Sequence, residues 1–391
     1  MNYKIFISLL LFIFNGGVLD AWPKGIVTRF YDFKVMFGPK AALLEFRGNG
    51  DVNDNNQTRL PPFDCQVYTT VRLVETTSIR KLCKTSTIVT VNGMYPGPTI
   101  YAQQDDRVVI KVTNLTPYNI TIHWHGVRQR LTCWFDGPAY ITQCPIQAGQ
   151  RFTYRFTLLN QRGTLLWHAH ISWLRATVHG PIVIYPKQGF GYPFELPSEE
   201  HVIVLGEYWL QDIQDLERQV RESGAGPPGS DAYIFNGHPG PFYKCSKHDV
   251  YTINVTKGKT YLLRIINAAL NMEHFFGVAD HLMTVVEADG EYTKPFTTPF
   301  LMLTPGQTYN VLIKANQPIG KYYMAMAPYM PAKNVPYLNK TSYAIFNYIK
   351  PSNVNALSTS SAIHHKPLLP SVNDTKSVED FTNKIKSLYP K

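Results

Sequence analysis

The sequence predicts an all-β protein with two β-sandwich domains. Short apolar or alternating runs recur along the chain and are separated by turn residues, which is typical of strands. Aromatic residues make up 13% of the chain, which also contains 26 glycines and 28 prolines, and this composition favours many strands joined by turns. The 391 residues allow two or three domains.

The first 21 residues are interpreted as a secretory signal peptide. Lys4 supplies the positive charge, Ile5 to Phe14 is an apolar stretch too short to span a bilayer, and cleavage is expected near Ala21. A buried N-terminal strand is the less favoured alternative. We expect no membrane span elsewhere in the chain.

Strands predicted in the first domain, residues 22–187, begin with an alternating run at 28–35. Further strands lie around a turn at Asn92-Gly93, Val108 to Val112 reads as a buried strand, and the series ends at 182–185. Residues 36–75 show no sustained period, and no fold is predicted for them.

The second domain, residues 188–350, follows a linker at Pro186–Pro197. We expect its strands to begin at His201–Leu205 and a short helix within 207–221. Residues 351–391 are polar and rich in Pro and Ser, so we interpret them as a linker.

Two His-x-His pairs stand out, His123-Trp124-His125 and His168-Ala169-His170. Residues i and i+2 of a strand point to the same face, so each pair places two imidazoles side by side. A single such pair is usually an ordinary surface or core feature. Two pairs in an apolar, Trp-rich setting favour a metal site, because buried histidines need partners, and imidazole suits copper or zinc.

The chain around these pairs resembles domain 1 of the plant laccases, which are multicopper oxidases. The resemblance extends from about Thr76 to the C-terminus, with a further patch at Thr28–Val35. Residues 235–237, 261–268 and 305–312 resemble parts of laccase domain 2, and 343–348 resembles its last strand. In domain 1 it is carried by Ile122-His123-Trp124-His125-Gly126, Trp134-Phe135-Asp136-Gly137-Pro138-Ala139-Tyr140, Ile141-Thr142-Gln143-Cys144-Pro145-Ile146, and Gln161-Arg162-Gly163-Thr164-Leu165-Leu166-Trp167-His168-Ala169-His170-Ile171-Ser172-Trp173-Leu174-Arg175.

This resemblance implies two cupredoxin-like (plastocyanin-like) Greek-key sandwiches and half of a trinuclear copper site. It implies that His123 binds the type 2 copper and that His125, His168 and His170 bind the type 3 pair. The implied reaction oxidises phenols such as lignin precursors by one-electron steps and reduces O2 to water. Asp136 would help to supply protons. From its position before Gly137-Pro138, Asp136 is equally well interpreted as a turn residue.

The type 1 copper site of the family is absent from this sequence. It needs a cysteine thiolate with two histidines, which the family supplies from His-Cys-His and His-Pro-x-His-Leu-His runs in domain 3, and neither run occurs here. We therefore expect residues 351–391 to lead toward a missing domain 3 and the chain alone to be inactive. The alternatives are a non-catalytic, secreted copper-binding or cell-wall glycoprotein and, last, a zinc hydrolase with Asp136 as its base.

Residues 36–75 separate two stretches that run almost directly into each other in the family. We interpret them as an aberrant insertion, such as translated intron sequence; a transcript joining Val35 to the Thr76 region would support this.

The cysteines are interpreted through the same resemblance. Cys83 and Cys245 match positions that bridge domains 1 and 2, and Cys144 matches one whose partner lies in domain 3. Cys133 replaces a residue that is usually glycine. Its pairing with Cys144 or Cys65 stays open.

Charge and glycosylation motifs point outside the cell. The formal net charge of +10 favours polyanions such as acidic cell-wall polysaccharide, whereas no basic run carries the aromatic platform that nucleic-acid binding would need. We expect an extracellular, apoplastic protein. Six Asn-x-Ser/Thr motifs are glycosylation candidates: Asn56, Asn114, Asn119, Asn254, Asn339 and Asn373.

The remaining histidines lack ligand-like spacing, so we expect them on the surface or in loops: His179, His201, His238, His248, His274 and His281. Trp167, Trp173, Met324 and Met326 are expected to pack in the cores.

Overall fold

The computed structural model describes residues 28–36, 77–349 and 365–389. The signal peptide at 1–21, nearly all of the insertion at 36–75, Cys65, Asn56 and the first part of the expected linker lie outside the described residues.

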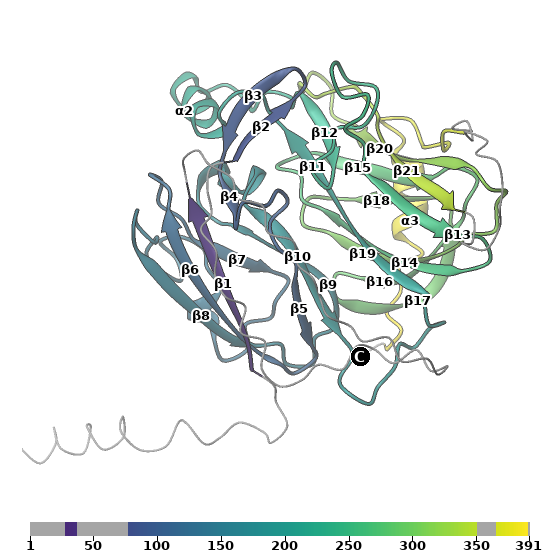
Figure 1. Ribbon diagram of the computed structural model, residues 1–391, viewed down its shortest axis with the longest axis horizontal. Coiled ribbons are helices and arrows are strands. Elements are labelled where there is room, and N and C mark those ends of the chain that lie inside the picture. The colour runs from purple at the N-terminus through teal and green to yellow at the C-terminus, as the bar shows by residue number, and fades with distance from the viewer. Residues whose placement is uncertain (1–27, 37–76, 350–364, 390–391) are drawn as a thin grey trace, which may run out of the picture.

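The first sandwich consists of two four-stranded sheets (Figure 1). One has the order β4-β1-β6-β8, with β1 at Thr28–Met36, β4 at Thr90–Val91, β6 at Arg107–Leu115 and β8 at Arg151–Thr157. The other has the order β5-β10-β9-β7, with β5 at Ile100–Gln103, β10 at His179–Tyr185, β9 at Gly163–Ala169 and β7 at Ile122–His125. Their inner faces share one apolar core, because alternate side chains point inward.

Two sequence expectations are confirmed in this sandwich. The predicted strand at 108–112 lies within β6, and its apolar side chains are buried. Asn92 and Gly93 both have positive φ, +54° and +67°, which asparagine and glycine tolerate better than other residues. They form the tight turn that follows β4.

The second sandwich packs a six-stranded sheet on a five-stranded one. The larger sheet has the order β12-β11-β14-β19-β16-β17, at Ala232–Phe235, Glu199–Tyr208, Thr260–Asn267, Thr308–Lys314, Met283–Ala288 and Glu291–Thr298. The smaller has the order β13-β21-β20-β15-β18, at Thr252–Thr256, Ser342–Ile349, Lys321–Tyr329, Glu273–Val278 and Phe300–Leu303. Met324 and Met326 are buried in this core, as expected.

The two sandwiches lie side by side and meet along β9 (Figure 1). All seven residues of β9 are buried. Trp167 points into the core of the first sandwich, whereas Leu166 packs against Val204, Ile266 and Ala268 of the second. A strand covered on both faces reads as continuously apolar, which matches its sequence.

A hairpin ties the sandwiches together. Strands β2 (Thr77–Lys81) and β3 (Lys84–Ile88) form a sheet of their own, and Ile79 and Leu82 pack on aromatic residues of the second sandwich. The disulfide between Cys83 and Cys245, expected from the resemblance, is present and closes 162 residues of sequence. A loop of this length is worth up to about 5 kcal/mol in the entropic model. Cys133 and Cys144 are exposed and not bonded to each other.

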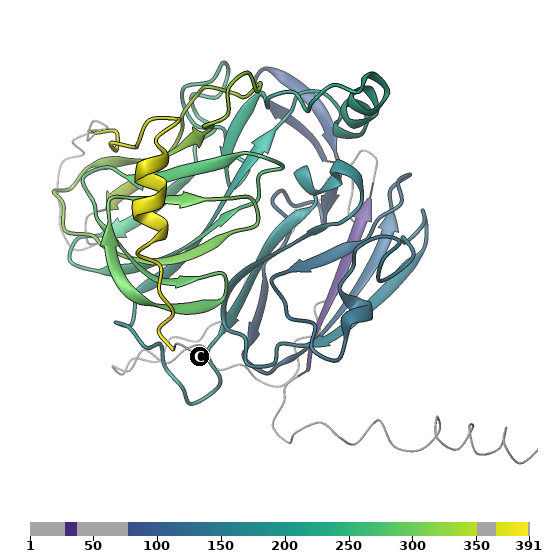
Figure 2. The ribbon, with the colours of Figure 1, turned by 180° about the vertical axis from the view of Figure 1, so that it is seen from behind.

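Two α-helices lie outside the sheets. Helix α2, Ile213–Ser223, begins at Asp212, whose carboxylate accepts hydrogen bonds from two backbone N–H groups, and it partly fulfils the helix expected within 207–221. Helix α3, Thr375–Thr382, crosses the back of the second sandwich (Figure 2). The linker interpretation missed α3, because only Val378 and Phe381 carry its apolar face; Phe381 is buried against Phe296 and Tyr309.

Two histidines that were expected on the surface or in loops, His179 and His274, are buried in strands, so that expectation was wrong for them. His281 lies in a loop, as expected, but is also buried. A neutral imidazole tolerates burial when its nitrogens find partners. His179 Nδ1 donates to the Arg175 carbonyl at 2.9 Å, and His281 pairs with the Tyr348 hydroxyl at 2.6 Å. Among the described residues, neither nitrogen of His274 has a partner, and burial lowers its pKa to about 3.

One glycosylation candidate, Asn114, is buried. The Asn114 side chain is fully buried, and its amide donates to the Tyr118 and Ile146 carbonyls while accepting from Thr116. An amide nitrogen held in this way has no room for a glycan. The other candidates among the described residues are exposed: Asn119, Asn254, Asn339 and Asn373. In the described part of the chain, no helix has the length and apolar character that a bilayer crossing requires.

Candidate metal centre

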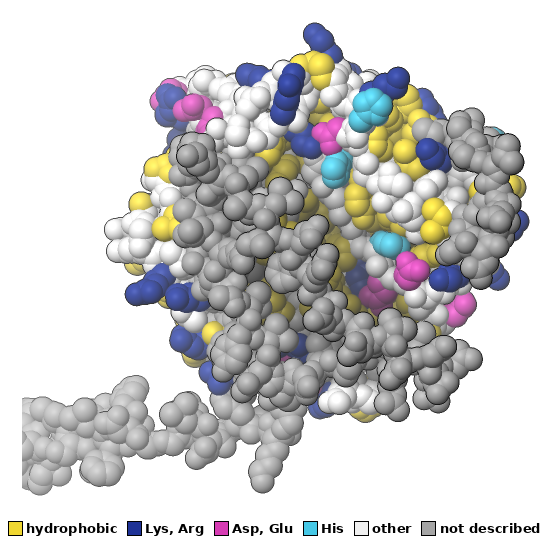
Figure 3. All heavy atoms as spheres, viewed as in Figure 1, with side chains coloured by type: hydrophobic (Ala, Val, Ile, Leu, Met, Phe, Trp, Pro, Cys, Tyr) yellow, Lys and Arg dark blue, Asp and Glu magenta, His cyan; other side chains and the backbone are white. Residues whose placement is uncertain are grey.

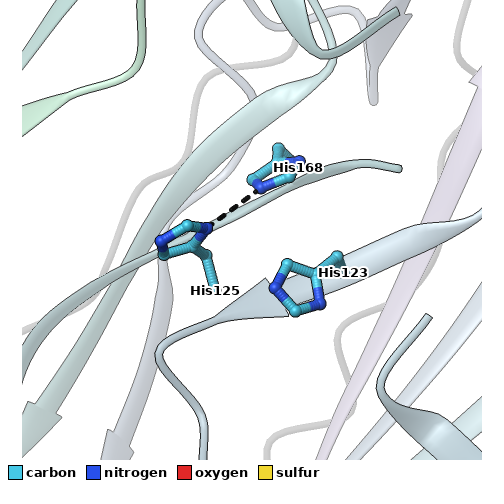
Figure 4. A group of neighbouring side chains, drawn as sticks. All are labelled: His123, His125 and His168. Atoms are coloured by element: carbon cyan, nitrogen blue, oxygen red, sulfur yellow. Dashed lines mark hydrogen bonds between the residues drawn. The ribbon is translucent and has the colours of Figure 1, made fainter. Parts of the chain in front are cut away.

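Antiparallel pairing of β7 with β9 brings the two His-x-His pairs together. The register places His123 directly opposite His168 and Trp124 opposite Trp167. Directly opposed residues share a face of the sheet. Both tryptophans therefore point into the core of the first sandwich, and the histidines point out of the opposite face. Figure 4 shows His123, His125 and His168 gathered around one space.

The imidazoles are close enough to share metal ions. One ring nitrogen from each of His123, His125 and His168 can be chosen so that the three atoms all lie within 4.8 Å of one another. His125 Nδ1 and His168 Nε2 are 3.3 Å apart, the separation of roughly 3–3.5 Å expected for two nitrogens bound to one ion. His170 is not in that group of three, but its ring centroid lies 5.2 Å from that of His123. The structure thus brings together all four predicted histidines.

Backbone carbonyls orient two of these rings. Nδ1–H of His123 donates to the Asp136 carbonyl at 2.8 Å, and Nδ1–H of His168 donates to the Ala169 carbonyl at 2.8 Å. Each bond makes Nε2 the nitrogen that carries the lone pair, and in His168 this nitrogen faces His125 Nδ1 at 3.3 Å. Metal-binding histidines almost always use their second nitrogen in this way. His125 differs, because its Nδ1 is the nitrogen that faces His168.

Burial favours the neutral form of three of these imidazoles, those of His125, His168 and His170. It lowers the pKa of His168 well below the ordinary value and also lowers the pKa of His125 and His170. The neighbouring imidazoles and Arg175 add smaller effects in the same direction. Since only neutral imidazole has a lone pair to donate, the environment favours metal binding at neutral pH. The donor set fits copper, and by itself it fits zinc as well.

Asp136 lies beside this cluster at the end of the 3-10 helix Cys133–Phe135. Its carboxylate is 3.4 Å from His123 Nδ1, and its side chain is 30% exposed, so it touches both the cluster and solvent. The next residue, Gly137, has φ +103°, and a Cβ there would lie 1.9 Å from the Ile122 carbonyl oxygen. The loop can approach β7 this closely only with glycine at that position. Asp136 is therefore both a turn residue and a neighbour of His123.

For two residues at the site, Arg175 and Gly306, the sequence predicted no role. Arg175, which follows His170 in a 3-10 helix at Ser172–Ala176, donates from its guanidinium to the Leu270 carbonyl. Gly306, in the second sandwich, lies against His125. With His168 and His179 they line a cavity of about 40 Å³ between the sandwiches. Both lay in stretches that carried the family resemblance, but nothing in their spacing linked them to the histidines.

Comparison with known proteins gives consistent results. Two family models, both described as multicopper oxidase, match residues 73–189 and 199–351. Laccase-6 of Arabidopsis thaliana is 55% identical over 315 residues, covering 81% of this chain and 54% of that protein. Laccase-12 of Oryza sativa subsp. japonica is 52% identical over 317 residues, covering 81% and 55%. This chain spans about half the length of these curated relatives.

Solved structures show the same fold. A laccase from Botrytis aclada superposes with a TM-score of 0.64 at 25% identity and covers 90% of this chain and 57% of that one. Fet3p, a multicopper oxidase that functions in iron import, has a TM-score of 0.63 at 23% identity, covering 86% and 55%. The two sandwiches are cupredoxin-like domains, as the sequence resemblance implied.

Proposed function

We propose that this chain, which belongs to the multicopper oxidase family and is a homologue of the plant laccases, binds copper through His123, His125, His168 and His170. In this proposal His123 takes the type 2 position and the other three take the type 3 positions of one half of a trinuclear site. The observation that carries it is the opposition of His123 and His168 across β7 and β9, with an imidazole on each strand oriented by a backbone carbonyl.

Copper bound here would supply the one-electron steps that couple oxidation of a phenol to reduction of O2. The residues of the chain would bind the copper and orient the imidazoles that hold it. The Asp136 carbonyl holds His123 in one tautomer, and the partly exposed Asp136 carboxylate is placed to pass protons between solvent and the site. Packing of the second sandwich over β9 shields His168 from water.

We also propose that the chain by itself does not oxidise phenols. Its four histidines would fill only half of the site, and the sequence has no cysteine flanked by histidine that could form a type 1 copper site. The laccase reaction, with lignin precursors as substrates, then needs ligands that these residues do not supply.

Copper loading of the whole chain tests both statements. We expect copper to bind, without the strong visible absorption of a copper–thiolate site and without oxygen consumption on addition of a phenol. Metal analysis, absorption spectroscopy and an oxygen electrode give the three measurements. A protein that binds no copper would contradict the proposed site, and a blue protein that consumes oxygen with a phenol would contradict the proposed inactivity.

A second candidate function is that of a secreted copper-binding glycoprotein of the cell wall. An open cleft of about 570 Å³ beside the disulfide favours it, since Arg80, Lys81, Lys247 and His248 line this cleft. Its one carboxylate, Asp249, is already paired with Lys81 at 2.6 Å and with His238 at 2.6 Å. The cleft therefore has an excess of positive charge, and Lys and Arg side chains occupy much of the rim of one face (Figure 3).

Binding to polygalacturonate tests this candidate. We expect retention on the immobilised polymer at low salt, release as salt is raised, and weaker retention for Lys247→Glu, because electrostatic binding is screened by salt. Lys257→Glu makes the same change of charge in an exposed turn outside the cleft and serves as the control. Equal retention of the two variants would remove the cleft from consideration.

A further inference from the structure

Gly306 of the second sandwich lies against one of the proposed copper ligands of the first. It sits in the turn Thr304–Gln307 between β18 and β19, with φ +87°. A Cβ built on Gly306 would lie 2.6 Å from His125 Nε2 and 2.7 Å from His125 Cε1. These separations are well inside van der Waals contact, so any side chain at this position would have to displace the turn or the imidazole.

The turn is held too firmly to move. Gly306 N–H donates to the Asn267 carbonyl at 2.8 Å, and Gln307 N–H donates to the Thr304 carbonyl at 3.0 Å. The Asn267 amide, which is fully buried, donates to the Leu303 and Met272 carbonyls, both at 3.0 Å. Withdrawal of the turn would break buried hydrogen bonds. The imidazole ring, held through rotatable bonds, is the part that would give way.

The position of that ring matters for the metal centre. His123 and His168 each have Nδ1 anchored by a backbone carbonyl, whereas His125 turns Nδ1 toward His168 Nε2 and presents Nε2 to the second sandwich. Rotation of His125 away from a side chain at position 306 would carry Nδ1 out of the 3.3 Å relation with His168.

We propose that Gly306 is a positioning residue for the copper centre: by having no side chain, it lets His125 hold Nδ1 toward the space shared with His168. The second sandwich then takes part in setting the metal affinity of histidines that all lie on the first. This inference rests on the proposed function, because it takes His125 to be a ligand.

The test compares Gly306→Ala with Gly258→Ala. Gly258 has φ +92°, so alanine there meets the same kind of backbone strain, but a Cβ at Gly258 has no atom within 4 Å. Both variants should lose melting temperature through the shared backbone strain, and Gly306→Ala should lose at least as much because it adds the clash with His125. Only Gly306→Ala should weaken Cu(II) binding, by about 10- to 100-fold, as loss of a ligand's supporting contact does. Competition titration with a Cu(II) chelator gives the affinities.

A double variant distinguishes an effect on the position of His125 from a general loss of structure. With His125→Ala the displaced ring is gone, so adding Gly306→Ala should cause no further loss of copper affinity. Equal copper affinity in Gly306→Ala and Gly258→Ala, or a further loss in the His125→Ala background, would overturn the inference.

A metal-free measurement keeps the inference separate from the proposed function. Imidazole ¹⁵N–¹H correlation spectra of the copper-free protein should show shifted His125 resonances in Gly306→Ala and unchanged ones in Gly258→Ala. Unchanged His125 resonances in both variants would overturn the inference even if copper binds. Failure of the wild-type chain to bind copper would instead contradict the proposed function.

Discussion

Replacement of His168 by glutamine is expected to lower the copper affinity of the chain by more than about 100-fold. Loss of a ligand costs more than loss of a ligand's supporting contact, which already costs about 10- to 100-fold. Among His123, His125 and His168, only His168 is buried, and it lies opposite His123 and 3.3 Å from His125 Nδ1. The substitution removes the imidazole of β9 that faces both histidines of β7. Isothermal titration with Cu(II) measures the effect.

His201→Gln is the matched control, since it makes the same change at a partly buried histidine of β11 that is no proposed ligand. Thermal melts of the copper-free proteins show whether each variant is folded. A folded His168→Gln protein that binds copper as tightly as His201→Gln would exclude His168 as a ligand, and with it the proposed centre.

The histidine pairs could be predicted from sequence because strand alternation alone puts i and i+2 on one face. That the two pairs lie close together could not be derived in this way, since the register of β7 on β9 depends on the long-range contacts of a whole sheet. Only the family resemblance suggested it. His179 and His274 show the limit of the same reasoning: without ligand-like spacing they were placed on the surface, yet each lies on a strand whose two faces are covered.

The contacts of β9 show why the roles of other residues at the site could not be predicted from the sequence. Its outward face carries Thr164, Leu166 and His168 in turn, and these meet a polar cluster, an apolar cluster and the metal centre. The partners of Thr164 and Leu166 come from the second sandwich, and those of His168 come from β7. Local patterns identify β9 as buried, but they cannot say what covers it. Gly306 and Arg264 were missed for this reason.

Arg264 forms the polar cluster that joins the sandwiches at β9. It is almost completely buried, and it donates to Glu200, to Thr164 of the first sandwich and to Tyr192, each at 2.9 Å. Glu287 lies beside it, fully buried, and accepts from the backbone N–H of Thr164 at 2.9 Å. Burial raises the pKa of Glu287 to about 7, and the charge of Arg264 opposes that rise.

Arg264→Met is expected to lower the free energy of unfolding by about 3–5 kcal/mol near pH 8, the usual cost of leaving a buried charge without its partner. The loss should shrink toward pH 5. Without Arg264, the folded-state pKa of Glu287 should rise further above its unfolded-state value. The folded state then keeps the proton on the Glu287 carboxyl over a wider pH range than the unfolded state does. Stability gained from that proton is present at low pH and is lost as pH rises through the folded pKa.

Guanidinium chloride unfolding at pH 5 and pH 8 measures both the size and the pH dependence. Arg218→Met is the control, because Arg218 pairs with Asp215 at 2.9 Å on the exposed face of α2 and should change stability far less, and equally at the two pH values. A loss for Arg264→Met that is as small as this control, or that grows toward pH 5, would show that the Arg264–Glu287 cluster does not hold the sandwiches together. A large loss at pH 8 that becomes smaller at pH 5 would show that the cluster at Thr164 links the sandwiches energetically at β9, the strand that also carries the proposed ligand His168.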